Sequence, residues 1–332
     1  MEAASSSACP ACDSSGARKT GAYGEYSLLR CGACGLVFSD PLAHPSAEFY
    51  EKSETYEKRG EMIGMPYLSE GLPEGDIDYK FWNFSKFFRD GIKPGGSLLD
   101  VGCAEGVFLG EAAKRGYCAV GIDINRRAIE RIRAARPGLD VHACTLGEFL
   151  KGDGRTFDVI TSFEVLEHLE NPKEYLREAR EALKSGGVLV LSLPNLDRNP
   201  DYTLAKFDNP PHHLTKWPKK AIDGFLERNG FVVERHEIAD PRFSYYFKLI
   251  GLARLDILVG LRNRAFRGRK AGAGGAKAGG KEGARRIANS IAKKAVWTLA
   301  TLMFFASSGL GKLTGGKPIE GPNHYIVARL RE

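Results

Sequence analysis

The sequence predicts a doubly wound α/β domain with a small metal-binding module in front of it. From residue 97 onward, short apolar runs such as SLLDV, CAVGID and VLVLSLPN alternate with amphipathic helical patterns. This alternation is typical of a mostly parallel sheet whose strands are joined by crossover helices. A glycine-rich turn directly follows the first of these runs, and two CxxC motifs stand near the N-terminus. The alternation and the glycine-rich turn assign residues 97–240 to the core domain, and the CxxC motifs indicate the metal-binding module.

The N-terminal module is predicted to be a zinc ribbon over residues 1–40. Cys9, Cys12, Cys31 and Cys34 form two CxxC pairs separated by 18 residues. That spacing allows two turns to present four thiolates tetrahedrally to one Zn2+ ion. A site with four protein ligands has no open position, so we expect this zinc to stabilise the fold and to take no part in chemistry.

Residues 41–96 are expected to form a connector and a lead-in helix, because the aromatic residues of DYKFWNFSKFFRDGI recur at helical spacing. A predicted insertion at 241–318 holds two apolar segments and a flexible Gly, Ala and Lys tract at 267–286. Residues 319–332 are predicted to supply the final core strand. Neither apolar segment is long and uninterrupted enough to span a membrane, so the insertion is expected to be a helical cap or a foot on a membrane surface.

The charge distribution argues against a general affinity for nucleic acid. The chain has 332 residues, is 43% hydrophobic and carries a formal net charge of +7. Residues 262–294 alone contribute +10, so the rest of the chain sums to −3. This local basic tract favours anionic lipid head groups as much as any other partner. The N-terminus has no apolar run after a basic start, which predicts a cytoplasmic protein, with peripheral contact at the inner face of the membrane as one option.

The turn after the first core strand predicts a nucleotide site. In LLDVGCAEGVF, Gly102, Ala104 and Gly106 stand where the backbone must turn tightly and approach a ligand. Asp123 ends the second predicted strand, 23 residues after Asp100, where a carboxylate can accept both hydroxyls of a ribose. The GxAxG spacing differs from the GxGxxG of nicotinamide enzymes. A phosphate or dinucleotide site and a degenerate fold without a ligand are the alternatives.

The chain from Phe81 to the C-terminus resembles the class I S-adenosylmethionine (SAM)-dependent methyltransferases. The resemblance rests on DVGCAEG, GID, FDVITSFEVLEHL, LKSGGVLVLSLPN and HYIVARL. It implies a seven-stranded sheet whose last strand is antiparallel, and SAM as the cofactor. The cofactor-binding residues that it implies include Asp100, which ends the first core strand. They also include Gly102, Ala104 and Gly106 at the methionine part, Asp123 at the ribose, Ile124 beside the adenine, and Thr145 with Leu146 where the family often has an acid near the adenine.

The stretch EVLEHL follows the fourth predicted core strand, so its polar side chains are expected at the carboxyl edge of the sheet, where ligands bind in open α/β folds. If a helical turn begins there, Glu164, Glu167 and His168 share one face. His213, in NPPHHLTKW, is predicted to reach the same edge as a fourth ligand. Carboxylates with imidazoles suit Mg2+ or Mn2+. The alternatives are His168 as a general base without metal, and a structural role at a helix N-terminus.

Similar ExxEH runs occur in quinone-biosynthesis O-methyltransferases and in plant small-RNA 2′-O-methyltransferases, where the run and a later histidine bind Mg2+. An alcohol is a poor nucleophile until its proton is removed, which a cation or a neutral histidine can assist. We therefore predict SAM-dependent O-methylation of a small or lipid-linked acceptor, such as a sugar in surface-polysaccharide assembly. The catalytic candidates are His168, Glu164 and His213. RNA methylation and a non-catalytic adaptor with a vestigial SAM site are the alternative functions.

Overall fold

The computed structural model describes residues 8–46, 49, 82–198, 208–242, 298–299, 301–303, 305–306 and 320–332. The chain divides into two compact units. The first comprises Met1–Asp197, Asp201–Ile238 and Asn323–Glu332, and the second comprises Arg198–Pro200 and Ala239–Pro322. Most of the predicted connector and insertion, with the whole 267–286 tract, lies outside the described residues. Among the residues that are described, no helix has the length and hydropathy needed to span a bilayer.

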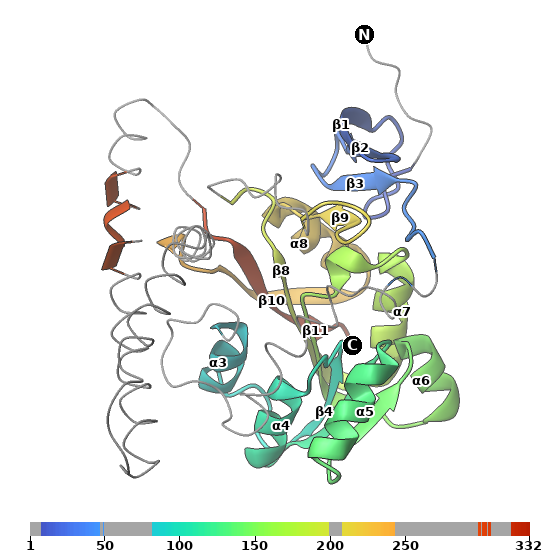
Figure 1. Cartoon of the computed structure of the whole chain (residues 1–332), viewed down its shortest axis with the longest axis vertical. Coiled ribbons are helices and arrows are strands. Elements are labelled where there is room, and N and C mark those ends of the chain that lie inside the picture. Colours follow the sequence, from blue (N-terminus) through green and yellow to red (C-terminus); the bar gives the residue numbers. More distant parts are fainter. Residues whose placement is uncertain are drawn as a thin grey trace, which may run out of the picture. The chain divides into compact units, whose positions relative to one another are not determined.

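A seven-stranded sheet forms the centre of the first unit, in the order β10-β11-β8-β7-β4-β5-β6 (Figure 1). Strands β4 to β8 pair in parallel, whereas β11 is antiparallel to both of its neighbours, β8 and β10. This arrangement confirms the predicted fold class. The strands are β4 (Ser97–Val101), β5 (Cys118–Asp123), β6 (Asp140–Ala143), β7 (Phe157–Phe163), β8 (Leu183–Pro194), β10 (Phe231–Ile238) and β11 (Asn323–Leu330).

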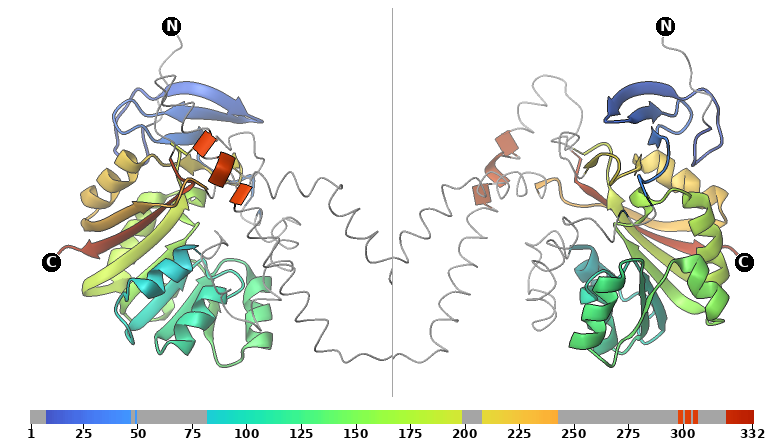
Figure 2. Two further views of the ribbon diagram at one scale, coloured as in Figure 1. Left: turned by 90° about the vertical axis from the view of Figure 1, so that its left-hand side faces the viewer. Right: turned by 45° about the vertical axis from the view of Figure 1, so that its right-hand side comes forward.

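Helices cover both faces of this sheet (Figures 1 and 2). Alternate residues of each strand point to opposite faces, so Leu98 and Leu99 in β4 enter different apolar clusters. The cluster of Leu98 includes residues of α3 and α4, and the cluster of Leu99 includes residues of α6, α7 and α8. The helices are α3 (Trp82–Arg89), α4 (Val107–Lys114), α5 (Arg126–Ala135), α6 (Leu146–Gly152), α7 (Pro172–Ala182) and α8 (Lys219–Arg228).

The aromatic spacing that predicts a lead-in helix corresponds to α3. Phe87 is fully buried and meets Phe108 of α4 edge to face, with ring centroids 5.1 Å apart. Phe88 stacks on the same Phe108 ring at 5.3 Å. Aromatic pairs of this kind add about 0.5–1.5 kcal/mol beyond the area that they bury. The helix is therefore held to the sheet through α4 by a continuous aromatic cluster.

A second, four-stranded sheet contains the ribbon, in the order β1-β2-β3-β9. Its first three strands are β1 (Arg18–Tyr23), β2 (Tyr26–Arg30) and β3 (Val37–Asp40), and all pairs are antiparallel. The fourth strand, β9 (Thr215–Lys216), comes from the core part of the chain and pairs with β3. The ribbon is thus joined to the core through a shared sheet, a feature that the sequence does not reveal.

Candidate active site

The predicted nucleotide turn lies between β4 and α4, at the carboxyl edge of the seven-stranded sheet. Gly102, Ala104 and Gly106 all have positive φ angles, of 76°, 47° and 66°. Both glycines relieve strain in this left-handed region, whereas Ala104 is a non-glycine residue held there by its surroundings. A Cβ atom added to Gly102 would lie 2.5 Å from Cγ2 of Val165, so the turn packs directly against the EVLEH segment.

Asp123, at the end of β5, holds this turn in place. Its Oδ2 accepts a hydrogen bond from the Ala104 amide at 2.9 Å, and its Oδ1 accepts one from the Asn125 amide at 2.7 Å. Burial raises the pKa of the Asp123 carboxyl. Ile124 follows directly and is 46% exposed, which is unusual for an isoleucine beside a core strand. A carboxylate with an exposed apolar neighbour is suited to a ribose and a flat ring, and the contacts of Asp123 and Ile124 with a cofactor stay predictions.

Thr145 and Leu146, which the resemblance places near the adenine, both contribute to the structure of the domain. Thr145 is the N-cap of α6, where its hydroxyl accepts from the Glu148 amide and the Glu148 carboxylate accepts from the Thr145 amide. Such a capping box satisfies two amides that the helix leaves open. Leu146 is 4% exposed and packs in the core. The adenine contacts of both residues stay predictions.

Asp100 supports the turn from below. It is 3% exposed and accepts a hydrogen bond from the Thr161 hydroxyl of β7 at 2.8 Å. Burial raises the pKa of the Asp100 carboxyl to about 7, because the charged form loses its hydration there. Asp100 therefore links β4 to β7 directly beneath the turn.

The EVLEH segment does not form the helical turn that would place Glu164 on the same face as Glu167 and His168. Glu164 has a φ of 58°, and a 3-10 helix, η2 (Leu166–His168), begins only two residues later. The left-handed residue redirects the chain, so the i, i+3, i+4 relation fails. The Glu164 carboxylate instead accepts hydrogen bonds from the Ser192 hydroxyl at 3.0 Å and the Asn323 amide at 2.5 Å.

Three of the four predicted ligands do come together. Glu167, His168 and His213 each offer a ligand atom, and these atoms lie within 4.8 Å of one another. The Nε2 of His168 is 3.8 Å from the Glu167 carboxylate, and the rings of His168 and His213 are 4.7 Å apart. Glu164 is outside this group. We refer to Glu167, His168 and His213 as the ligand cluster.

The environment of the ligand cluster suits a divalent cation. The Nδ1 of His168 lies 2.6 Å from the His212 carbonyl oxygen, which can only accept, so the proton sits on Nδ1 and Nε2 offers its lone pair to the cluster. Burial, with the nearby His213, lowers the pKa of His168 well below its usual range, so the ring is neutral at physiological pH. Glu167 is 1% exposed, and a carboxylate so deeply buried is commonly neutralised by a cation.

The segment that carries His213 is held by charged and backbone contacts. The Asp208 carboxylate lies 3.3 Å from Nδ1 of His213, an arrangement common among metal-binding histidines. The buried Lys216 donates to the Asn209 side chain at 2.9 Å and is 3.5 Å from the Asp208 carboxylate. Asp208 was not identified from the sequence as part of the site. The available signal was its position, five residues before the candidate ligand His213.

The four ribbon cysteines form the second candidate metal site. Their sulfur atoms lie within 4.8 Å of one another, with Cys9 and Cys34 3.7 Å apart and Cys12 and Cys31 3.6 Å apart. The hydrogen bond from Cys9 lowers the pKa of Cys34 to about 5. Four converging sulfurs on two tight turns fit a tetrahedral zinc ion and leave no position for substrate.

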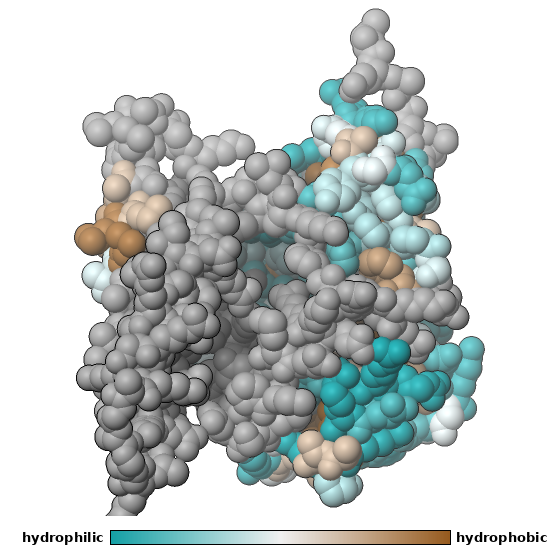
Figure 3. Space-filling model, in the orientation of Figure 1, coloured by the Kyte–Doolittle hydropathy of each residue, from teal (hydrophilic) through white to brown (hydrophobic). Residues whose placement is uncertain are grey.

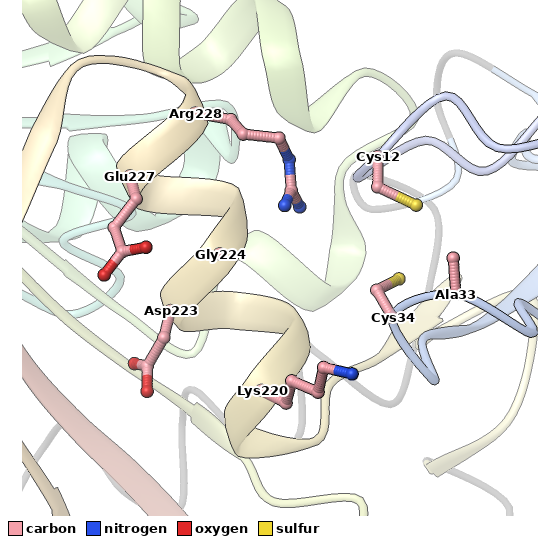
Figure 4. A pocket seen from close by; sticks show the side chains of 8 residues that line it. All are labelled: Cys12, Ala33, Cys34, Lys220, Asp223, Gly224, Glu227 and Arg228. Atoms are coloured by element: carbon pink, nitrogen blue, oxygen red, sulfur yellow. The ribbon is translucent and has the colours of Figure 1, made fainter.

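The ribbon also borders a groove against α8. Figure 4 shows Cys12, Ala33 and Cys34 on one side of this groove, and Lys220, Asp223, Glu227 and Arg228 of α8 on the other. The Arg228 guanidinium donates to the Ala11 carbonyl at 3.3 Å, which ties the first cysteine turn to the helix. In Figure 4 the side chains of Lys220 and Arg228 extend toward the cysteine turns, whereas those of Asp223 and Glu227 point away from them.

Comparisons of sequence relate part of this chain to methyltransferases. Residues 80–236 match the family described as a methyltransferase domain. The ubiquinone biosynthesis O-methyltransferase of Roseobacter denitrificans is 36% identical over 143 residues, which cover 41% of this chain and 56% of that protein. The same enzyme of Cereibacter sphaeroides is 39% identical over 123 residues, or 35% of this chain and 49% of that protein. The chain therefore spans about half the length of the curated relatives that it matches.

Solved structures show the same fold. Phosphoethanolamine N-methyltransferase 2 of Haemonchus contortus, in complex with SAM, has a TM-score of 0.53 at 14% identity and covers 86% of this chain and 60% of that chain. A mycolic acid cyclopropane synthase complexed with S-adenosylhomocysteine (SAH) and CTAB also has a TM-score of 0.53, at 15% identity, over 86% of this chain and 99% of that chain. The fold and the family match together define a class I SAM-dependent methyltransferase domain. The sequence relatives given above are the O-methyltransferases of ubiquinone biosynthesis.

Proposed function

We propose that the protein transfers a methyl group from SAM to a hydroxyl oxygen of a small or lipid-linked acceptor, and that a divalent cation in the ligand cluster assists the transfer. The observation that carries this proposal is the packing of Gly102 against Val165. This packing brings the turn at 102–106, which we assign to SAM, directly beside the segment that supplies Glu167 and His168. The relatives that methylate an oxygen support the choice of a hydroxyl acceptor.

The chemistry requires an activated oxygen. A lone pair of the acceptor oxygen attacks the methyl carbon of the sulfonium, the C–O bond forms, the C–S bond breaks, and SAH leaves. The acceptor hydroxyl must release its proton to solvent water before or during this step. Bound Mg2+ or Mn2+ supplies a Lewis acid that lowers the pKa of a hydroxyl. The chain contributes a buried carboxylate at Glu167 and the imidazoles of His168 and His213. The left-handed Glu164 directs its carboxylate toward Ser192 and Asn323 at the same edge.

We also propose that Asp123 binds the ribose of SAM and that the turn at Gly102–Gly106 lies against its methionine part. In the structure, Asp123 holds the Ala104 and Asn125 amides, so a ribose would share the carboxylate with them or displace one of them. Zinc in the ribbon, held by the four cysteines, would stabilise the fold and take no part in the methyl transfer.

Contact with a membrane surface belongs to the same set of proposals. In the second unit, Leu299, Leu302 and Phe305 are 49%, 61% and 62% exposed. Figure 3, in the orientation of Figure 1, shows brown (hydrophobic) atoms where Figure 1 draws the short described pieces between residues 298 and 306. The +10 segment at 262–294 precedes them in the sequence. Exposed apolar side chains that follow a basic segment in the sequence support an anionic lipid surface as partner, and a lipid-linked acceptor would lie within reach of such a surface.

The acceptor can be assigned by following labelled methyl from SAM into a fractionated cell extract. Label in the organic phase supports a lipid or lipid-linked acceptor. Label in the aqueous phase that resists nuclease supports a soluble sugar or another small molecule. Label that nuclease removes would replace this proposal with RNA methylation. Binding of SAH without any transfer to the extract would favour a non-catalytic adaptor.

A further inference from the structure

Three chain segments meet at the ligand cluster, and one of them continues directly from the last strand of the ribbon, β3, into the first residues of the connector. Glu167 and His168 belong to η2, and His213 belongs to the segment that leads into β9. The third segment runs from β3 to His44. It carries no ligand of the cluster, yet it contacts both of the segments that do.

His44 makes the most direct of these contacts. Its Nε2 lies 2.8 Å from the carbonyl oxygen of His168, which is itself a ligand. Its Nδ1 lies 2.9 Å from the carbonyl oxygen of Pro211, next to the His212 carbonyl that accepts from the His168 ring. Its backbone amide donates to the Glu170 carboxylate at 2.7 Å. One imidazole therefore lies against a carbonyl oxygen of each ligand-bearing segment. A neutral ring donates to one of these oxygens, and a ring with protons on both nitrogens donates to both.

A backbone ladder reinforces this bridge. The Leu214 amide donates to the Glu167 carbonyl at 2.9 Å, and the Ser39 amide donates to the Leu214 carbonyl at 2.9 Å. Residue 214 is thus held between η2 on one side and ribbon strand β3 on the other. The side chain of His213, one residue earlier, is aimed at the cluster by the same backbone.

Other contacts of the ribbon with the core lie elsewhere. Lys173 of α7 forms an ion pair with Asp13, and Arg228 of α8 donates to the Ala11 carbonyl. Apolar residues of the ribbon also share a core cluster with α7 and α8. Docking of the ribbon therefore does not depend on His44, whose contacts are concentrated on the residues that present the cluster.

We propose that His44 is a positioning residue for the ligand cluster, by which the ribbon fixes the spacing between His168 and His213. The proposal rests on the proposed function, because it presumes that the cluster binds a divalent cation. Outer contacts of this kind set the orientation of metal-binding side chains, and their loss typically weakens metal affinity about 10- to 100-fold.

The test is a titration of the full-length, zinc-loaded protein with Mn2+, in which free Mn2+ is followed by electron paramagnetic resonance. His44→Ala is expected to weaken Mn2+ binding at least about 10-fold. His44→Gln, which keeps a donor able to reach one carbonyl, is expected to fall between His44→Ala and the wild type. Lys173→Ala removes a different contact between ribbon and core and is expected to bind Mn2+ like the wild type. Zinc content and SAH affinity of each variant report whether the ribbon and the core remain folded.

The outcomes separate this proposal from the function on which it rests. Wild-type affinity in His44→Ala, with Mn2+ bound by the wild type, would overturn the positioning role and leave the proposed function standing. Equal losses in His44→Ala and Lys173→Ala would also overturn it, because any weakening of the ribbon would then suffice. Absence of Mn2+ binding in the wild type, with SAH still bound, would reject the cation site itself and the positioning role with it.

Discussion

The Nδ1 atom of His168 lies 2.6 Å from the carbonyl oxygen of His212, the residue directly before His213. This hydrogen bond fixes the tautomer of His168 and leaves its Nε2 facing Glu167 and His213. It also links the two chain segments that supply the ligand cluster. A ligand side chain and the backbone beside another ligand thus orient each other before any cation binds.

Loss of the Glu167 carboxylate should weaken cation binding without disturbing the cofactor site. Glu167→Gln keeps the size of the side chain and removes its charge. We expect Mn2+ affinity to fall at least about 10-fold and methyl transfer to fall about 100-fold or more. SAH affinity, measured by calorimetry, should stay within about twofold, because the change involves no cofactor-binding residue. Glu234→Gln, at an exposed pair with Arg329 of the core sheet, is the matched control.

Loss of the Asp123 carboxylate should weaken the cofactor site selectively. Hydrogen bonds to a charged group contribute about 1.5–3 kcal/mol each, so Asp123→Ala should weaken SAH binding about 10- to 100-fold. The Ala104 and Asn125 amides also lose their acceptor, which should loosen the turn. Calorimetry with Asp153→Asn as the control checks this. Unchanged affinity in Asp123→Ala would remove the carboxylate from the ribose site.

Asp100 should make the stability of the protein depend on pH in a defined direction. Its folded-state pKa of about 7 lies above the ordinary value of 3.8, so the protonated form favours the folded state. That stabilisation is complete below about pH 3.8 and is lost as the pH rises to 7. The Asp100→Asn side chain does not ionise, so the variant does not lose this stability as the pH rises. Its amide oxygen can still accept the hydrogen bond from the Thr161 hydroxyl. Its stability relative to the wild type should therefore rise by about 2 kcal/mol between pH 5 and pH 8 in urea unfolding. If the stability difference between Asp100→Asn and the wild type did not change over this pH range, the Asp100 carboxyl would not have the raised pKa described above.

Removal of one ribbon cysteine should release zinc and destabilise the chain beyond the ribbon. Cys31→Ser should reduce bound zinc from one equivalent to well below half. Because β3 pairs with β9, hydrogen exchange at residues 213–216 should accelerate as well. Mass spectrometry with Cys118→Ser, an exposed single cysteine, as the control measures both effects. Full zinc occupancy in Cys31→Ser would refute the four-cysteine site.

The sequence was a good guide to features set by local pattern. The alternation of apolar runs and helices predicts the core sheet, and the paired CxxC motifs predict the sulfur cluster. The resemblance supplies the antiparallel β11. Glu167, His168 and His213 were foreseen because polar residues after neighbouring parallel strands converge at one edge.

Other features depend on backbone conformation or on distant contacts. The positive φ of Glu164 and the late start of η2 leave no mark in EVLEH, so the expected helical face was wrong for Glu164. His44 contacts Pro211 across 167 positions, and β3 pairs with β9 across a similar separation. Contacts of this kind follow from the packing of the ribbon on the core, which a single sequence does not encode in any short motif.

The central claim is that a cation in the ligand cluster assists methyl transfer from SAM. The most direct measurement follows labelled methyl from SAM into the acceptor fraction of a cell extract, with EDTA, with EDTA followed by excess Mg2+ or Mn2+, and without either. The account predicts transfer that EDTA suppresses, that added cation restores, and that Glu167→Gln lacks under all three conditions. Transfer that persists in EDTA and in Glu167→Gln would contradict it and leave His168 acting without metal.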